Sequence, residues 1–393
     1  WEQRKLDTIT DVRDGTHDSP QYVEDGHPFI TSKNVKDGFI NYEDIQYVSD
    51  KDYEEINKRS KVDKNDILMG MIGTIGNIAL VRETPDFTIK NVALIKDIGD
   101  VFYHYLYHCL QSNSVAHQLD ENLDGGTQKF IALNKIRELV IPVPSEYEQH
   151  KIGDYMELLD NLITLHQRKY DKLTNVKKSM LEKMFPKNGS NVPEIRFKGF
   201  TEAWKQRKLG EIAEIRRGLT YKPDDVKTSG IRVLRSSNIN EEYFETYKDD
   251  VFVDEVAINI PYVKNGDIII TSANGSSRLV GKHAIIKNIP DNSMVHGGFM
   301  LVASTNEPEF LNSSMSSPWY AKFINIYVAG GNGAIGNLSK SDLDNQEILV
   351  PSVVEQQKIG AYFRNLDNLI TLHQRKLEKL RNIKKSMLEK MFI

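Results

Sequence analysis

The chain has 393 residues, of which 39% are hydrophobic and 27% are charged, and this composition is typical of a globular protein with two or three domains. Its 51 Lys and Arg residues are outnumbered by 55 Asp and Glu residues, so no bulk positive charge indicates a nucleic-acid partner. One cysteine, no run of 18 apolar residues and no basic-then-apolar leader argue against a disulfide-stapled secreted protein and a membrane protein, so the cytoplasm is the expected location.

Residues 1–145 are expected to form a first mixed sheet domain, which makes the fold class α+β. A strand ends in the turn Thr31–Asn34, and a strand, a Gly-rich turn and another strand follow from Lys64. The Gly125-Gly126 turn then precedes a strand that ends at Ser145. Strands separated by such turns predict a sheet domain rather than a helical bundle.

One long helix is expected at 146–185. Between Glu146 and Lys183 only Gly153 interrupts a stretch without Gly or Pro, and about 38 residues would span roughly 57 Å. Its apolar residues recur every seven positions, with partners four places further on, which predicts a heptad seam. A seam of this kind needs another helix to pack against.

The rest of the chain repeats this arrangement. A linker rich in Gly, Pro and Asn is expected at 186–203, a second sheet domain at 204–352 and a second long helix at 353–393. The first copy has no counterpart to most of the linker, and Trp1 matches Trp204, so we expect a segment before Trp1 that this sequence does not contain.

The repeat is clearest in the two helices. LDNLITLHQRK at Leu159–Lys169 recurs letter for letter at Leu366–Lys376, and KKSMLEKMF at Lys177–Phe185 recurs at Lys384–Phe392, both at an offset of 207 residues. The sheet domains match only weakly, and the offset between them drifts. The helices are therefore the near-identical part of the internal repeat, whereas the loops of the two copies differ.

The two seams predict an antiparallel pair of helices within one chain, forming an intramolecular coiled coil with a pseudo-twofold repeat. His166 and His373 stand where Leu is expected; a pH switch is one interpretation, and the favoured one is that they fix the register of the pair. The seam residues, which are also candidates for partner docking, are Ile152, Leu159, His166, Leu173, Met180, Ile359, Leu366, His373, Leu380 and Met387.

Each candidate for metal or catalytic chemistry lacks part of its motif. His104 and His108 have the i, i+4 spacing of metal ligands, but no further ligand motif follows, so we favour helix packing. The phosphate-loop-like GSSRLVGKH from Gly275 has five residues between its glycines, and His283 stands where Ser or Thr is needed. NIPY from Asn259 lacks the first Pro of the Asn-Pro-Pro-Tyr motif of amino-methyltransferases. We expect no catalytic residue and no metal site.

Two divergent sheet domains, each followed by a near-identical long helix, closely resemble the specificity (S) subunits of type I restriction-modification systems. The sequence EQxKIG opens both helices, at Glu148 and Glu355, and VPEIRFKGF at Val192–Phe200 resembles the segment that precedes each target recognition domain in that family. The resemblance covers essentially the whole chain, and its most specific signal is the duplicated helix.

The resemblance implies a division of labour. Each target recognition domain reads one half of a bipartite, asymmetric DNA site, and the paired helices set the gap between the half-sites. The helices also dock two methyltransferase subunits, to which two motor-nuclease subunits can add. S-adenosylmethionine, ATP and magnesium belong to those partners, so the chain itself is expected to bind no cofactor. The alternatives are a stand-alone methyltransferase or nuclease with degenerate motifs, and a scaffold adaptor that does not bind DNA.

Base-reading residues are expected in the turns, where the two copies differ. Arg and Lys suit guanine, Asn and Gln suit adenine, and Gly lets a backbone come close. The candidates in the first domain are Thr31, Ser32, Lys33, Asn34, Thr127, Gln128 and Lys129, and those in the second are Arg235, Ser236, Ser237, Asn238, Asn274, Ser276 and Arg278.

Overall fold

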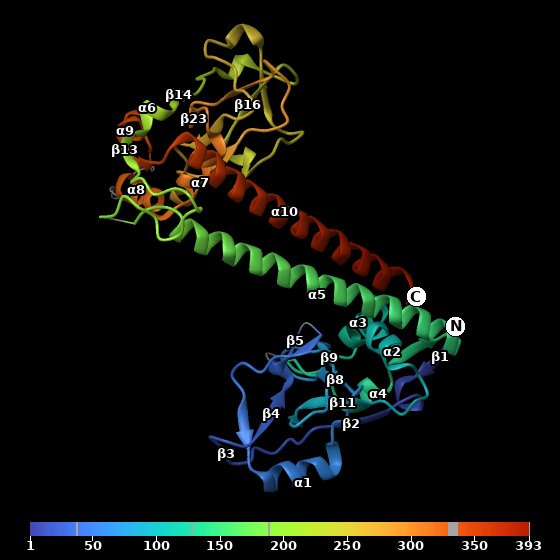
Figure 1. Cartoon of the computed structure of the whole chain (residues 1–393). Helices are drawn as coiled ribbons and strands as arrows, with labels where there is room; N and C mark the ends of the chain where they lie inside the picture. Colours follow the sequence, from blue (N-terminus) through green and yellow to red (C-terminus); the bar gives the residue numbers. More distant parts are fainter. Residues whose placement is uncertain (37, 127–128, 188, 329–336, 393) are drawn as a thin grey trace. The chain divides into compact units, whose positions relative to one another are not determined.

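The computed structural model describes residues 1–36, 38–126, 129–187, 189–328 and 337–392 (Figure 1). The chain divides into two compact units. Unit 1 contains Trp1–Arg168 and Gln374–Ile393, and unit 2 contains Lys169–His373. Each unit therefore combines one sheet domain with part of each long helix. No helix in the described ranges is long and apolar enough to cross a membrane.

Unit 1 contains two four-stranded sheets and two strand pairs. One sheet is antiparallel, and in the other β10 runs parallel to β4. The first sheet has the order β2 (Asp11–Asp14), β11 (Val92–Lys96), β8 (Ile67–Gly70), β9 (Ile78–Leu80), and the second β10 (Thr88–Lys90), β4 (His27–Thr31), β7 (Gln46–Val48), β3 (Tyr22–Val23). The pairs are β1 (Glu2–Lys5) with β12 (Val140–Val143) and β5 (Val35–Lys36) with β6 (Phe39–Ile40).

The helices of unit 1 cover these sheets. Every residue of the central strand β8 is buried, because apolar groups pack on both of its faces. Ser49 caps α1 by accepting a hydrogen bond from the backbone N–H of Asp52 at 3.2 Å. The helices are α1 (Asp50–Ser60), α2 (Tyr103–Cys109), α3 (Asn113–Glu121), α4 (Leu133–Arg137) and the long α5 (Glu146–Lys183).

Unit 2 repeats the same strand orders. Its sheets are β14 (Glu214–Arg217), β23 (Met300–Ser304), β20 (Ile268–Thr271), β21 (His283–Ile285), and β22 (Met294–His296), β16 (Ile231–Leu234), β19 (Val251–Val253), β15 (Val226–Lys227). Its pairs are β13 (Lys205–Lys208) with β24 (Glu347–Val350) and β17 (Ile239–Asn240) with β18 (Tyr243–Phe244). Its helices are α6 (Leu209–Ile212), α7 (Pro308–Met315), α8 (Pro318–Val328), α9 (Lys340–Asn345) and the long α10 (Val353–Lys390). The internal repeat predicted from the sequence is therefore confirmed.

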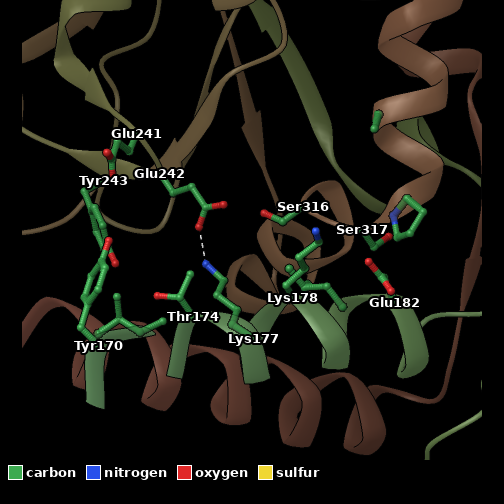
Figure 2. Close-up of a pocket in the computed structure, with 14 residues that line it drawn as sticks. Tyr170, Thr174, Lys177, Lys178, Glu182, Glu241, Glu242, Tyr243, Ser316 and Ser317 are labelled. Carbon is green, nitrogen blue, oxygen red and sulfur yellow. Dashed lines mark hydrogen bonds and ion pairs between the residues drawn. The ribbon is translucent and has the colours of Figure 1, made fainter. Parts of the chain in front are cut away.

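The long helices α5 and α10 pack antiparallel, as predicted. In unit 1, Asp160 of α5 accepts from Lys384 of α10 at 2.6 Å. In unit 2, Lys177 of α5 contacts Asp367 of α10 at 2.7 Å, and Figure 2 shows the same lysine paired with Glu242. The two helix pairs are reciprocal, because Lys177 and Lys384, like Asp160 and Asp367, occupy equivalent repeat positions. The ten predicted seam residues are all buried or half-buried.

The residues that directly follow each long helix complete a sheet-domain core. In unit 1, Phe392 is 2% exposed, and its ring centroid lies 5.6 Å from that of Tyr105. In unit 2, Phe185 is 3% exposed and lies 5.9 Å from Trp204 and 6.0 Å from Phe310. Both phenylalanines close the repeated KKSMLEKMF segment, so this segment is a core element as well as part of a helix pair.

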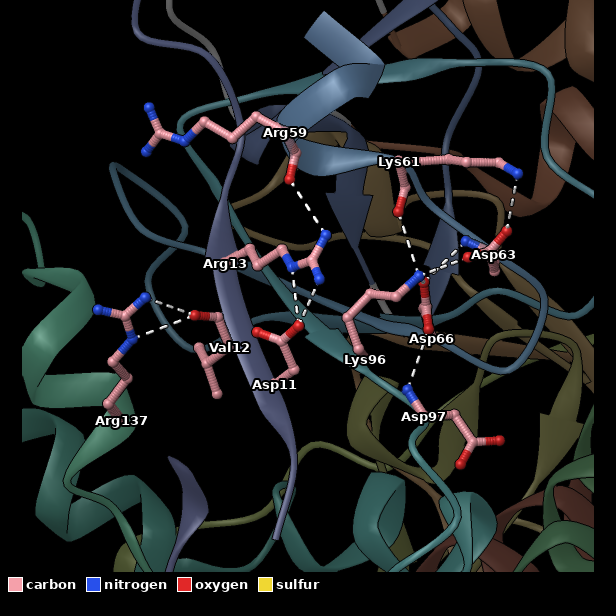
Figure 3. A network of polar contacts seen from close by, with 10 residues as sticks. All are labelled: Asp11, Val12, Arg13, Arg59, Lys61, Asp63, Asp66, Lys96, Asp97 and Arg137. Atoms are coloured by element: carbon pink, nitrogen blue, oxygen red, sulfur yellow. Dashed lines mark hydrogen bonds and ion pairs between the residues drawn. The ribbon is translucent and has the colours of Figure 1, made fainter. Parts of the chain in front are cut away.

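A polar network ties the first sheet of unit 1 to neighbouring segments (Figure 3). Lys96 on β11 donates to Asp66 at 2.8 Å and to Asp63 at 2.6 Å. Burial raises the pKa of Asp66 even though Lys96 opposes it. Arg137 of α4 donates to the carbonyl of Val12 on β2 at 2.7 Å. These bonds hold the sheet whose strands β8 and β9 flank the Gly-rich turn of unit 1.

Candidate nucleic-acid interface

The turn Ser32–Asn34 of unit 1 is held by its own polar side chains. Asn34 is 2% exposed; its side-chain oxygen accepts from the N–H of Thr31 at 3.0 Å, and its amide donates to the carbonyl of Asn41 at 3.1 Å. The hydroxyl of Ser32 donates to the carbonyl of Asn91 at 2.6 Å. Lys33 is exposed, and its ammonium donates to the carbonyl of Asp44 at 3.1 Å. Of this turn, Lys33 is the residue that faces solvent.

The equivalent turn of unit 2 is built in the same way. Asn238 is fully buried; its side-chain oxygen accepts from the N–H of Arg235 at 2.8 Å, and its amide donates to Glu245 at 3.0 Å and Asp250 at 2.9 Å. Arg235 and Ser237 are exposed, and Ser236 is half-buried. Asn34 and Asn238 therefore share one role in the two copies, which is to close the turn.

In unit 1 the separate turns expected from the sequence lie side by side. The hydroxyl of Thr74 donates to the carbonyl of Ser32 at 2.7 Å, which joins the 70–77 turn to the first turn. Ile72 forms a β-bridge with Phe130, which joins it to the third turn. Lys129 is exposed beside Phe130, whereas Thr127 and Gln128 lie outside the described residues.

Unit 2 brings its turns together through equivalent contacts. The amide of Asn274 donates to the hydroxyl of Ser236 at 3.0 Å, and its side-chain oxygen accepts from the N–H of Ser276 at 2.9 Å. Ser276 and Arg278 are exposed. A bridge between Ala273 and Asn337 leads into the third turn, whose Gly330-Gly331 lies outside the described residues.

Sequence reasoning missed one part of this cluster. The Gly-rich turn of unit 1 was predicted between two strands, but none of its residues was named as a candidate. Gly73 and Gly76 have φ of 75° and 77°, a region that favours glycine, so the backbone is exposed there without a side chain. The repeat carried the missing signal, because this turn aligns with the candidate turn at Asn274–Arg278.

One group of potential metal ligands lies in unit 1. Ligand atoms of His108, Glu157 and Asp160 all lie within 4.8 Å of one another. Both carboxylates already have cationic partners, since Lys384 lies 2.6 Å from Asp160 and Arg82 lies 3.2 Å from Glu157. Burial, followed by the charge of Lys384, lowers the pKa of His108 to about 2. A divalent cation would have to compete with two fixed positive charges, so we propose no metal here.

The long helices carry exposed apolar side chains outside the seam. On α5 in unit 1, Tyr155, Leu158 and Leu165 are 46%, 54% and 46% exposed. On α10 in unit 2, Leu369 and Leu372 are 44% and 45% exposed. These side chains are exposed, whereas the ten seam residues are buried or half-buried.

Comparison with known proteins defines the class of protein. The family model described as the type I restriction modification DNA specificity domain matches residues 1–175 and 201–382. The chain therefore belongs to the DNA specificity family of type I restriction-modification systems. Within such a system it is the specificity subunit, which is the non-catalytic component.

Relatives match over nearly the full length. The specificity subunit of the type I restriction enzyme MjaVIII from Methanocaldococcus jannaschii is 23% identical over 394 residues, covering 94% of this chain and 88% of the relative. The EcoKI specificity subunit of Escherichia coli K12 is 22% identical over 417 residues, covering 100% and 88%. The solved type I S subunit from M. genitalium has a TM-score of 0.63 at 18% identity, covering 100% of this chain and 96% of that chain, and so shares the fold.

Proposed function

We propose that each unit reads one half of a bipartite, asymmetric DNA site through its converging turns. The observation that carries this proposal is that the two units share one framework but present different side chains at these turns. A shared framework would place both readers alike on DNA, while different side chains would select different bases. The recognition domains proposed are 1–145 and 204–352, separated by the helix 146–185 and the linker 186–203 and followed by the helix 353–393.

The exposed members of each turn cluster are the proposed base-reading residues. In the first domain they are Lys33 and Lys129, and in the second they are Arg235, Ser237, Ser276 and Arg278. Thr127 and Gln128, which lie outside the described residues, are proposed from the sequence alone. Long cationic and hydroxyl side chains of this kind can reach base edges in the major groove. Thr31, Ser32, Asn34, Ser236, Asn238 and Asn274 are hydrogen-bonded within the turns, and we assign them to holding the turns in shape.

The proposed partners are two methyltransferase subunits and two motor-nuclease subunits. The outward apolar residues of α5 recur as Tyr155, Leu158, Leu162 and Leu165, at spacings of three and four that suit a partner helix. Three of the four equivalent positions of α10 are also apolar or aromatic, at Tyr362, Leu369 and Leu372. Two equivalent surfaces suit two copies of one partner. S-adenosylmethionine, ATP and magnesium would bind those subunits, and the complex would act in the cytoplasm.

Exchange of one recognition region tests the two-reader proposal. Replacing Gly15–Gly126 by the same region of another specificity subunit should change one half of the methylated site and leave the other half and its adenine modification intact. Sequencing of methylated DNA from cells that contain the hybrid complex gives the site directly. If both halves changed, or neither did, the two domains would not read separate half-sites.

Two rival functions give different results with simple assays. A stand-alone enzyme predicts methylation or cleavage when the purified chain alone is mixed with DNA, S-adenosylmethionine and magnesium. A scaffold adaptor predicts that the assembled complex protects DNA without sequence preference. The proposal requires no reaction from the chain alone and a sequence-dependent footprint from the complex.

A further inference from the structure

Each recognition turn continues directly into a short hairpin. In unit 2 the hairpin β17–β18 follows Asn238, and the N–H of Glu245 at its far end donates back to the Asn238 carbonyl at 3.0 Å. In unit 1 the hairpin β5–β6 follows Asn34, and the N–H of Asn41 donates to the Asn34 carbonyl at 2.7 Å. Because turn and hairpin share these bonds, the position of the hairpin sets the position of the turn.

In unit 2 a single lysine joins the hairpin to both long helices. Lys177 of α5 forms an ion pair with Glu242, which lies between β17 and β18 (Figure 2). It also pairs with Asp367 of α10 at 2.7 Å. The lysine side chain is only 12% exposed. Burial favours the neutral amine, but the two carboxylates outweigh it and raise the pKa of Lys177. The ammonium group of Lys177 therefore stays charged throughout the pH range in which proteins are ordinarily folded.

The surroundings of this link make the lysine important. A cavity of about 440 Å³ opens beside it, lined by α5, the hairpin and the turn between α7 and α8. Tyr170, Thr174 and Tyr243 stand around the ion pair in Figure 2 rather than filling this space. Ile239 and Phe244 pack the hairpin against the sheet core, and Tyr243 hydrogen-bonds Thr371 of α10. Beside the cavity, the ion pair of Lys177 with Glu242 supplies a charged contact between the hairpin and α5.

Unit 1 has an equivalent link made from different groups. The guanidinium of Arg82 lies 5.6 Å from the ring centre of Phe39 on β6 and 5.7 Å from that of Tyr107 on α2. It also contacts Glu157 of α5 at 3.2 Å. A cation again joins the recognition hairpin to a long helix, although here it comes from the sheet domain.

We propose that Lys177 is a positioning residue for DNA discrimination, because its bond to Glu242 fixes the recognition turn of unit 2 relative to α5 and α10. Arg82 has the same role in unit 1. Neither residue needs to touch DNA. The inference rests on the proposed function, since it assumes that Arg235 and its neighbours face the second half-site. Without the ion pair, the base-reading residues are still present, but the turn that carries them is no longer held in one position. Contacts made from a loosely held turn discriminate poorly between bases.

Glu242→Gln in the assembled complex tests the link. Methylation rates are measured on DNA with the intact site and on DNAs with one base pair changed in either half. Discrimination in the half read by unit 2 should fall about tenfold, while the other half is unaffected. Glu241→Gln removes the same charge one residue away and should change neither half, and Lys177→Arg should keep most of the discrimination. Arg82→Gln should give the mirror result, with the loss confined to the first half-site.

The outcomes separate this inference from the proposed function. Arg235→Ala serves as the direct-contact reference. If it relaxes one half-site and Glu242→Gln does not, the positioning role is wrong and the two-reader proposal stands. If Arg235→Ala and the domain exchange also leave the half-sites unchanged, the proposed function itself is wrong. An equal loss of rate on every DNA would mean that Glu242 only supports folding, which would also overturn the positioning role.

Discussion

Asn34 and Asn238 illustrate how one residue type carries the framework of both domains. Each is buried, accepts a hydrogen bond from the residue that begins its turn and donates to a carbonyl on the far side of the hairpin. Leaving such a buried amide without partners costs about 1 to 3 kcal/mol. These asparagines therefore explain why the two turns match in sequence, and the residues beside them explain why the turns differ in what they expose.

The burial of His108 leads to a prediction about how the stability of unit 1 depends on pH. Its pKa is held at about 2 by burial and then by the charges of Lys384, His104 and Arg82, whereas an unfolded histidine has a pKa of about 6.5. Between these two pKa values the unfolded chain binds a proton at this imidazole, whereas the folded chain does not. The contribution to stability is complete above pH 6.5 and declines as the pH falls toward 2, by up to about 1.4 kcal/mol per pH unit.

Urea unfolding between pH 7 and pH 5, followed by hydrogen exchange in α2, measures this effect. His108→Gln should flatten the pH dependence of unit 1, whatever it does to stability at pH 7. Replacing the exposed His117 by Gln is the matched control. Equal slopes for the wild type and His108→Gln would contradict the assignment.

At the scale of elements, each long helix has two apolar surfaces with different uses. The seam closes the α5–α10 pair, and the KKSMLEKMF end completes a sheet-domain core through Phe185 or Phe392. Replacing such a buried phenylalanine by Ala typically costs 3 to 5 kcal/mol. These two demands account for the repeat at the seam and core positions. The outward residues Leu162 and Leu165 also recur, as Leu369 and Leu372, although they belong to neither the seam nor a core.

The outward stripe predicts the number of bound methyltransferases. Leu158→Glu combined with Leu165→Glu places two charges on the α5 stripe without touching the seam, and burying unpaired charges in an interface is strongly unfavourable. Native mass spectrometry of the reconstituted complex should then show one methyltransferase subunit instead of two. Leu369→Glu with Leu372→Glu should remove the other subunit. Asn175→Glu, exposed on another face of α5, should leave two bound. Loss of both subunits in either double variant would contradict two separate docking surfaces.

For the whole molecule, the division into units does not follow the order of the chain. Unit 1 includes the end of α10, and unit 2 includes the end of α5. Each half of the sequence therefore supplies a helix end to the other half's core. We therefore expect the exchanged helix ends, rather than the linker, to keep the two halves together.

Expressing the chain as two pieces, 1–187 and 188–393, tests this interlaced arrangement. The pieces should purify together through a tag on one of them, and the assembled complex should methylate the same site as the intact chain. Combining Phe185→Ala with Phe392→Ala should release the untagged piece, because both helix ends lose their buried anchors. Two pieces that fold but fail to bind each other would show that the linker is essential.

Much of the fold could be predicted because the relevant signals are local or repeated. A heptad pattern depends on residues three and four apart, so α5 and α10 and their seam were evident in the sequence alone. The internal repeat showed that the sheet domains share a framework. The positions of the turns followed from Gly, Asn and Ser between apolar runs. Thr74 and its neighbours were not named as candidates, although their turn aligns with the candidate turn Asn274–Arg278 of the second copy.

The sequence by itself determined the duplicated architecture, the paired helices and the family, because a heptad period and an internal repeat can be recognised from the order of residues alone. Only the tertiary structure decided which turn residues face outward. Asn34 is buried because Asn41 and Thr31 surround it, and Arg235 is exposed because Asn238 closes the turn beneath it. The link from Lys177 to Glu242 joins residues 65 apart in the chain. Burial and pairing of polar groups depend on partners brought together by folding, and no local pattern specifies them.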